Sequence, residues 1–139
     1  MAFVEWTPEL EVGHPEMDAQ HQRLLAIINE YHEALERKAP QSTLIETFAK
    51  VADFAAYHFA DEEALMAQCG FPQLSRHRRV HQQLVNRVSE LMGDLRAERV
   101  GAARDIQFFL KLWLTAHIQD IDRQYLPYVA KPKQAVAAA

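Results

Sequence analysis

The chain has 139 residues, of which 49% are hydrophobic and 24% charged, a composition typical of one soluble globular domain. Its formal net charge is -4, from 15 basic and 19 acidic residues, which argues against nucleic acid or an anionic membrane surface as the main partner. No apolar run approaches the roughly 18 residues that span a bilayer, so we expect no membrane insertion.

The chain carries one cysteine, Cys69. This count excludes an internal disulfide framework and indicates a reducing compartment. The opening residues, MAFVEWTPELEV, lack the basic and apolar regions of a signal peptide. We therefore expect a cytoplasmic protein in which Cys69 is a small packing residue.

Apolar residues recur every three to four positions along most of the chain, whereas the alternation typical of strands is nearly absent. Residues 1–15, with two prolines and a glycine, predict an N-terminal arm. A first helix is predicted over about 16–38, where KAPQS breaks it. A second helix is predicted to begin with Ser42 as its N-cap and to end before the GFP turn at 70–72.

A third helix is predicted from near Ser75, and AERVGA forms the turn that follows it. The fourth helix, the most apolar, is predicted to begin near Ala102 and to end around residues 125–127. The alanine-rich residues 130–139 are expected to form a mobile tail.

Short connections between long helices make sequential helices antiparallel. The sequence therefore predicts an all-α fold, an up-down-up-down four-helix bundle with an N-terminal arm. We expect one domain over residues 1–139, with the bundle at about 16–127.

The histidines fall at spacings that share helix faces. His77 and His81 lie four residues apart, as do His58 and Glu62. In an antiparallel bundle, residues near the start of the first and third helices meet residues near the end of the second and fourth. Six side chains from four helices are thus predicted at one level of the bundle: His21, His58, Glu62, His77, His81 and His117.

Buried histidine and glutamate are costly unless they are hydrogen-bonded, paired or bound to metal. Imidazole suits zinc, copper, iron and nickel, but five imidazoles are too many for one tetrahedral zinc. They fit two metal ions that share carboxylate bridges, with Glu62 as one bridge.

The second bridge stays open on spacing alone. On a regular helix Asp120 lies about 60° from His117 and Asp122 about 140°, so helix geometry alone favours Asp120. Asp61 similarly competes with Glu62, because it lies three residues after His58.

This pattern resembles the hemerythrin family, specifically its single-domain bacteriohemerythrins, over about residues 5–128. The resemblance rests on His21 in DAQHQRLL and on the spacings H-x-x-x-E, H-x-x-x-H and H-x-x-x-x-D. Accessory features are Trp6, the GFP turn and WLTAHI from Trp113. The positions that match family ligands are His21, His58, Glu62, His77, His81, His117 and Asp122.

The resemblance implies two iron ions (Fe2+/Fe3+) in a non-haem site that binds O2 reversibly. It assigns three histidines, His77, His81 and His117, to one iron, and His21 and His58 to the other, which takes O2. Glu62, Asp122 and an oxo or hydroxo group would bridge the irons. A π-type widening after His117 would bring Asp122, rather than Asp120, to the ligand face. Residues matching the family's O2 pocket are Phe59, Trp113 and Leu114.

The resemblance favours an O2-binding protein for storage, delivery or sensing, and not an enzyme. One alternative is a di-iron oxidase or oxygenase, but such bundles use Glu-x-x-His pairs and more carboxylates. The other is an interaction module that senses O2, nitric oxide or iron. Expected partners are O2 and either an oxygen-consuming enzyme or a signalling protein.

Two histidines match no ligand position. His14, in the arm, is expected to be solvated. His32 lies roughly 16 Å along the helix from His21, too far to share the site. We expect it to be a core histidine with a hydrogen-bond partner.

Overall fold

The computed structural model describes residues 3–129, apart from the side chains of Leu114, Asp120 and Ile121. The tail predicted at 130–139 lies outside the described residues. Four α-helices make up most of the structure: α1 (Pro15–Glu36), α2 (Gln41–Gln68), α3 (Leu74–Arg96) and α4 (Ala102–Ala116).

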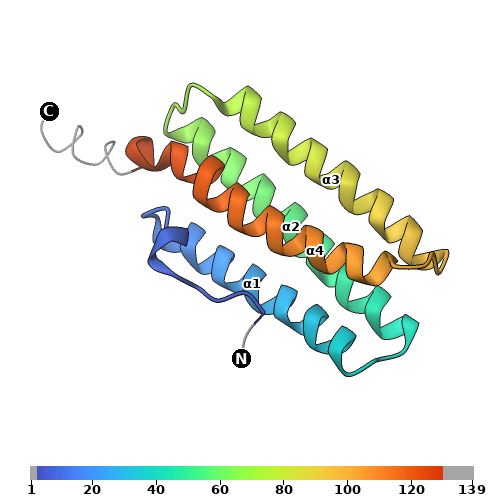
Figure 1. Cartoon of the computed structure of the whole chain (residues 1–139). Helices are drawn as coiled ribbons and strands as arrows, with labels where there is room; N and C mark the ends of the chain where they lie inside the picture. Colours follow the sequence, from blue (N-terminus) through green and yellow to red (C-terminus); the bar gives the residue numbers. More distant parts are fainter. Residues whose placement is uncertain (1–2, 130–139) are drawn as a thin grey trace, which may run out of the picture.

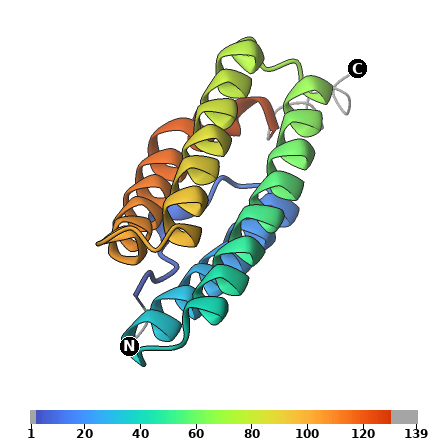
Figure 2. The same ribbon diagram turned by 90° about the vertical axis from the view of Figure 1, so that its right-hand side faces the viewer.

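The four helices lie side by side, and each runs antiparallel to the one before it (Figure 1). The view at 90° shows the same four-membered bundle along a different side (Figure 2). This arrangement confirms the predicted up-down-up-down fold. No helix in the described part of the chain is both long and apolar enough to cross a membrane.

Apolar side chains fill the bundle interior from all four helices. Tyr31 of α1 is fully buried, packs its ring 5.9 Å from that of Phe48 of α2, and donates its hydroxyl to the carbonyl of Ala103 over 2.9 Å. Leu91 of α3 and Leu110 of α4 are also buried. Burial of such side chains is the main stabilising term of a bundle, and it fixes how the helices lie against one another.

The N-terminal arm packs on the bundle. It contains a 3-10 helix, η1 (Pro8–Leu10), and buries Leu10 and Val12. The side chain of Asn29 joins α1 to the arm, because it accepts from the amide of Val4 and donates to the carbonyl of Val4, each over 2.9 Å. The arm lies beside α1 in Figure 1.

The turn after α2 sets the position of α3. Gly70 has φ +71°, a left-handed conformation that glycine adopts without steric cost. The amide of Phe71 then donates to the carbonyl of Met66 over 3.0 Å and closes the helix end. The chain reverses within a few residues, so the end of α2 lies beside the start of α3.

Two local predictions were wrong. The N-cap of α2 is Pro40, not Ser42, and no side chain caps this helix. The carbonyl of Pro40 accepts from the amides of Thr43 and Leu44, so the helix begins ahead of the serine. His14 is half-buried rather than solvated, and its Nδ1 accepts from the amide of Met17 over 3.2 Å, which caps α1.

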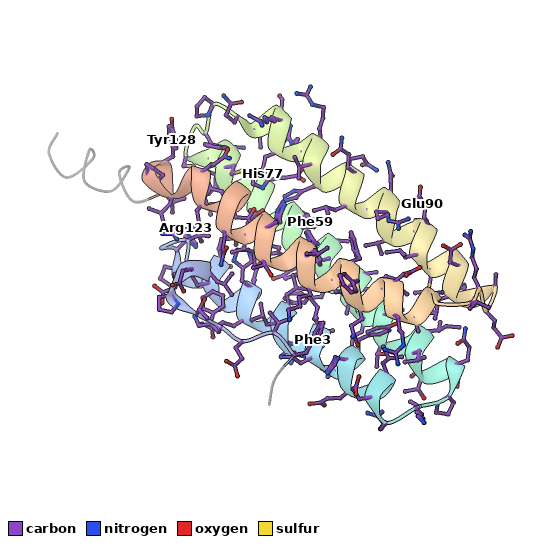
Figure 3. The ribbon with its side chains drawn as sticks, in the orientation of Figure 1. Phe3, Phe59, His77, Glu90, Arg123 and Tyr128 are labelled. Carbon is purple, nitrogen blue, oxygen red and sulfur yellow. The ribbon has the colours of Figure 1, made fainter. Side chains whose placement is uncertain are left out.

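Two other expectations fare better: Cys69 is a packing residue as expected, and His32 has the expected hydrogen-bond partner, although it is half-buried rather than in the core. The Nδ1 of His32 lies 2.9 Å from Oε1 of Gln107, and its ring stacks on Phe3 with centroids 4.2 Å apart. Phe3 lies against the bundle in Figure 3. Cys69 is half-buried and packs against the hydrophobic core.

The C-terminal end of α4 departs from regular α geometry. The helix continues as a π-helix, η2 (His117–Ile121), and then as a 3-10 helix, η3 (Asp122–Tyr125). The π-type widening predicted after His117 is therefore present. In a π-helix a residue lies nearly above the fifth residue before it, so His117 and Asp122 can face the same side.

Candidate metal centre

Seven ligand-type side chains meet inside one end of the bundle. His117 is 6% exposed and the other six are 2% exposed or less. They come from α1, α2 and α3 and from η2 and η3, which continue α4: His21, His58, Glu62, His77, His81, His117 and Asp122. His77 is seen within the bundle in Figure 3. Burial of so many polar groups in one place requires a partner that satisfies them together.

Glu62 directs its two oxygens to different histidines. Its Oε1 lies 3.2 Å from Nε2 of His77 and 3.0 Å from Nε2 of His81. Its Oε2 lies 3.5 Å from Nε2 of both His21 and His58. One carboxylate thus faces two groups of imidazoles, one through each oxygen.

Asp122 also directs its two oxygens to different histidines. Its Oδ1 lies 3.0 Å from Nε2 of His77 and 2.9 Å from Nε2 of His117. Its Oδ2 lies 3.2 Å from Nε2 of His21. The two carboxylates therefore lie between the same two groups of histidines.

The donors form two sets that could each hold a metal ion, with all donor atoms of a set within 4.8 Å of one another. One set consists of Glu62, His77, His81, His117 and Asp122. The other consists of His21, His58, Glu62 and Asp122.

The spacing of the donor atoms suits a transition metal. The Nε2 atoms of His21 and His58 face each other at 2.9 Å. Two nitrogens each about 2.1 Å from a metal, at right angles to each other, lie about 3 Å apart.

Several of these atoms have close neighbours but no hydrogen bond. Nε2 of His81 and His117 and both carboxylate oxygens of Asp122 are buried without a hydrogen-bond partner among the described residues. Their lone pairs converge at distances near 3 Å without the alignment of a donor with an acceptor. Metal ions would satisfy this set, and imidazole with carboxylate is a donor set that iron accepts.

Electrostatics hold the metal-free cluster in an ionised state. Burial lowers the pKa of His21, but the carboxylates of Asp122 and Glu62, within 3.5 Å of its Nε2, outweigh burial and raise the pKa to about 9. The pKa of His77 is raised to about 9 by the same balance.

The two carboxyl groups shift in the opposite direction. Burial raises the pKa of Glu62, yet the four imidazoles within 3.5 Å of its oxygens outweigh burial and hold the pKa well below its usual value. Burial and the charge of Glu62 raise the pKa of Asp122, but its histidine neighbours lower it more. Both carboxylates are therefore ionised and available as ligands at neutral pH.

Three residues around the cluster were not found from the sequence. Gln20 contacts Nδ1 of His58, Glu63 contacts Nδ1 of His81, and Tyr125 contacts Glu62. Their only sequence signal is proximity to a ligand position, which many surface residues share.

Two of the three predicted pocket residues lie beside the histidines. The ring of Phe59 stacks on that of His81, with centroids 3.9 Å apart and planes inclined by 13°, and lies 5.9 Å from the ring of His58. Trp113 meets Phe59 edge-on at 5.9 Å. Both are buried, and Figure 3 places Phe59 inside the bundle. The side chain of Leu114 lies outside the described residues.

The sequence left two pairs of candidate carboxylates open, Asp61 against Glu62 and Asp120 against Asp122. Asp61 is outside both donor sets and accepts instead from the side chain of Gln20. The side chain of Asp120 lies outside the described residues, whereas Asp122 is in both sets.

Comparison with known proteins agrees with this geometry. The profile described as "Hemerythrin HHE cation binding domain" matches residues 12–129. The chain belongs to the hemerythrin family.

Relatives match over most of their length. A bacteriohemerythrin of Stenotrophomonas maltophilia is 31% identical over 129 residues, covering 93% of this chain and 83% of that protein. A bacteriohemerythrin of Pseudomonas aeruginosa is 32% identical over 130 residues, with the same coverage. The crystal structure of a wild-type hemerythrin superposes with a TM-score of 0.85 at 25% identity, covering 93% of this chain and 99% of that one.

Proposed function

We propose that this hemerythrin-family protein binds O2 reversibly at a centre of two iron ions. The observation that carries the proposal is the placement of Glu62 and Asp122, each of which offers one oxygen to each group of histidines. Such a carboxylate can link two metals and offset part of their mutual repulsion.

The residues divide into two ligand groups under this proposal. His77, His81 and His117 would hold one iron, and His21 and His58 the other, with Glu62 and Asp122 as bridges. An oxo or hydroxo group would complete the bridging set. The open position would belong to the iron with fewer histidines. Two ferrous ions held by these residues would each supply one of the two electrons that O2 takes up on binding.

The protein contributes position and shielding. Five buried imidazoles from separate helical segments are held in place by packing, so their positions are largely set before metal binds. Phe59 and Trp113 form an apolar wall against the histidine rings, which keeps water from that side. Shielded apolar surroundings of this kind favour release of intact O2 over turnover, so we expect no enzymatic activity.

The physiological role would be storage, delivery or sensing of O2, within a reducing cytoplasm. The relatives are named bacteriohemerythrin, and this name supports the O2-binding proposal. An oxygen-consuming enzyme or a signalling protein would be the recipient or reader.

The test is an absorption spectrum of iron-loaded, reduced protein under argon, then in air, then after return to argon. We expect about two irons per chain, a new visible band in air, and loss of that band when O2 is removed. Protein with two irons that shows no spectral change in air, or a change that argon never reverses, would contradict reversible O2 binding.

A further inference from the structure

The histidines of the two donor sets are supported from behind by different side chains. In the set with three histidines, Nδ1 of His81 donates to Oε2 of Glu63 over 2.8 Å. The other oxygen of Glu63 lies 3.3 Å from Nε of Arg78, and this ion pair orients the carboxylate. His81 is therefore held by a negative charge.

In the set with two histidines, no charged group in the described part of the chain is hydrogen-bonded to Nδ1 of either histidine. Nδ1 of His58 lies 2.7 Å from Oε1 of Gln20. Nδ1 of His21 is buried and has no hydrogen-bond partner among the described residues. This pair of imidazoles therefore rests on one neutral amide.

Asp61 fixes which way the amide of Gln20 points. Its Oδ2 accepts from Nε2 of Gln20 over 2.8 Å, and a carboxylate oxygen can only accept. Oε1 of Gln20 must then face His58, so Nδ1 of His58 must carry the proton. The lone pair of His58 is left on Nε2, the atom that faces the cluster. Asp61, which spacing alone left as an alternative to Glu62, thus acts on His58 indirectly, through Gln20.

These two supports differ in strength. A hydrogen bond to an ionised acceptor is roughly twice as strong as one between neutral groups, and a histidine that donates to a carboxylate becomes a more basic ligand. Removal of such a partner typically lowers metal affinity by about 10-fold to 100-fold.

We propose that Gln20 and Glu63 are positioning residues that give the two metal positions unequal affinity. The position of His21 and His58 holds its metal more weakly and releases it first, whereas the position backed by Glu63 retains its metal longer. This inference rests on the proposed two-metal centre and adds to it an order of loading and loss.

The test follows iron release from the ferrous, fully loaded protein under argon, with a coloured ferrous chelator in excess. Wild-type protein should release its iron in two phases of equal amplitude. Gln20→Leu should accelerate the fast phase by about 10-fold and leave the slow phase unchanged, and Glu63→Gln should accelerate the slow phase alone. Gln22→Leu, at an exposed glutamine on the same helix, should leave both phases unchanged.

A double variant that keeps the net charge distinguishes a change in the basicity of His58 from a general loosening of the fold. The double variant Gln20→Glu with Asp61→Asn places a carboxylate against His58 and an amide behind it. It should slow the fast phase by about 10-fold, which a merely structural role would not do. Release of wild-type iron in one phase, acceleration of both phases by each single variant, or a double variant that behaves like Gln20→Leu would overturn the inference.

These outcomes do not depend on O2. Protein that fails to respond to air but releases two irons in the expected order would refute reversible O2 binding and leave the unequal positions standing. Protein that binds O2 but releases both irons together would do the reverse.

Discussion

The hydroxyl of Tyr125 donates a hydrogen bond to Oε2 of Glu62 over 2.9 Å, and both side chains are fully buried. Burial and the two carboxylates raise the pKa of Tyr125, so the hydroxyl keeps its proton and remains a donor. The contact joins the segment after the π-helix to the C-terminal part of α2. It restrains the oxygen of Glu62 that faces His21 and His58.

Tyr125→Phe should keep the fold but lower its free energy of unfolding. The ring keeps its edge-on contact with Phe71, at 6.3 Å between centroids, but Glu62 loses a buried donor. Hydrogen bonds to charged groups contribute about 1.5–3 kcal/mol. We expect the metal-free variant to lose about that much free energy of unfolding in urea. Tyr57→Phe, at an exposed tyrosine, is the control, and an equal loss in both variants would contradict the role of this contact.

His81→Ala should lower iron content to about one atom per chain or less, because it removes one of three imidazoles from its set. His14→Ala should lose the cap of α1, at a cost of about 1 kcal/mol, and keep both irons. Elemental analysis of both purified variants gives the answer. Full iron occupancy in His81→Ala would remove this residue from the ligand set.

Asp122→Asn should reduce iron binding far more than Asp120→Asn. Asp122 faces both histidine groups, and an amide offers a single neutral oxygen where two negatively charged ones stood. Iron content and the spectrum in air measure the effect. Equal loss in the two variants, or greater loss in Asp120→Asn, would show that the π-helix does not select the bridge.

The sequence predicted the bundle and the ligand level because both follow from local spacing. Apolar periodicity places the core, and a four-residue interval places His77 beside His81. The place of Asp122 in both donor sets did not follow from regular helix geometry, which favoured Asp120. It followed from the resemblance, together with the π-type widening that the structure contains.

The supporting residues could not be predicted, because each contact joins positions distant in sequence. Gln20 and His58 are 38 residues apart, and Glu62 and Tyr125 are 63 apart. Such contacts depend on how helices rotate against one another, which periodicity fixes only to within a residue or so. Ser42 failed as an N-cap for a local reason, because the carbonyl of Pro40 accepts from the amides of Thr43 and Leu44 and the helix begins two residues earlier.

The metal-free protein should lose stability as the pH rises from about 6.5 to 9. The folded pKa of His21 and of His77 is about 9, above the unfolded value of about 6.5. The folded state therefore binds more protons in this window, so the free energy of unfolding falls with pH. The depressed pKa values of Glu62 and Asp122 act oppositely, and their stabilisation is lost as the pH falls below about 4.

Urea midpoints of the metal-free protein across pH 5–9 check this dependence. Metal binding near pH 7.5 should also release about two protons per chain, measurable by calorimetry in buffers of different ionisation enthalpy. A midpoint that rises between pH 6.5 and 9, or metal binding without proton release, would contradict the raised histidine pKa values.

Phe59→Leu should shorten the life of the oxygenated protein without preventing O2 binding. No ligand changes, but the ring that stacks on His81 and meets Trp113 is lost, and the smaller side chain leaves space beside polar groups. Water can enter such a space, since it finds hydrogen-bond partners there. Water and protons then reach the oxygenated centre and speed its irreversible oxidation. We expect the visible band to decay several-fold faster in air at fixed pH, at equal iron content.

The control is Phe108→Leu, at a phenylalanine of α4 that is 70% exposed, and its visible band should decay like that of the wild type. Equal decay of all three proteins would show that the apolar wall does not protect the site.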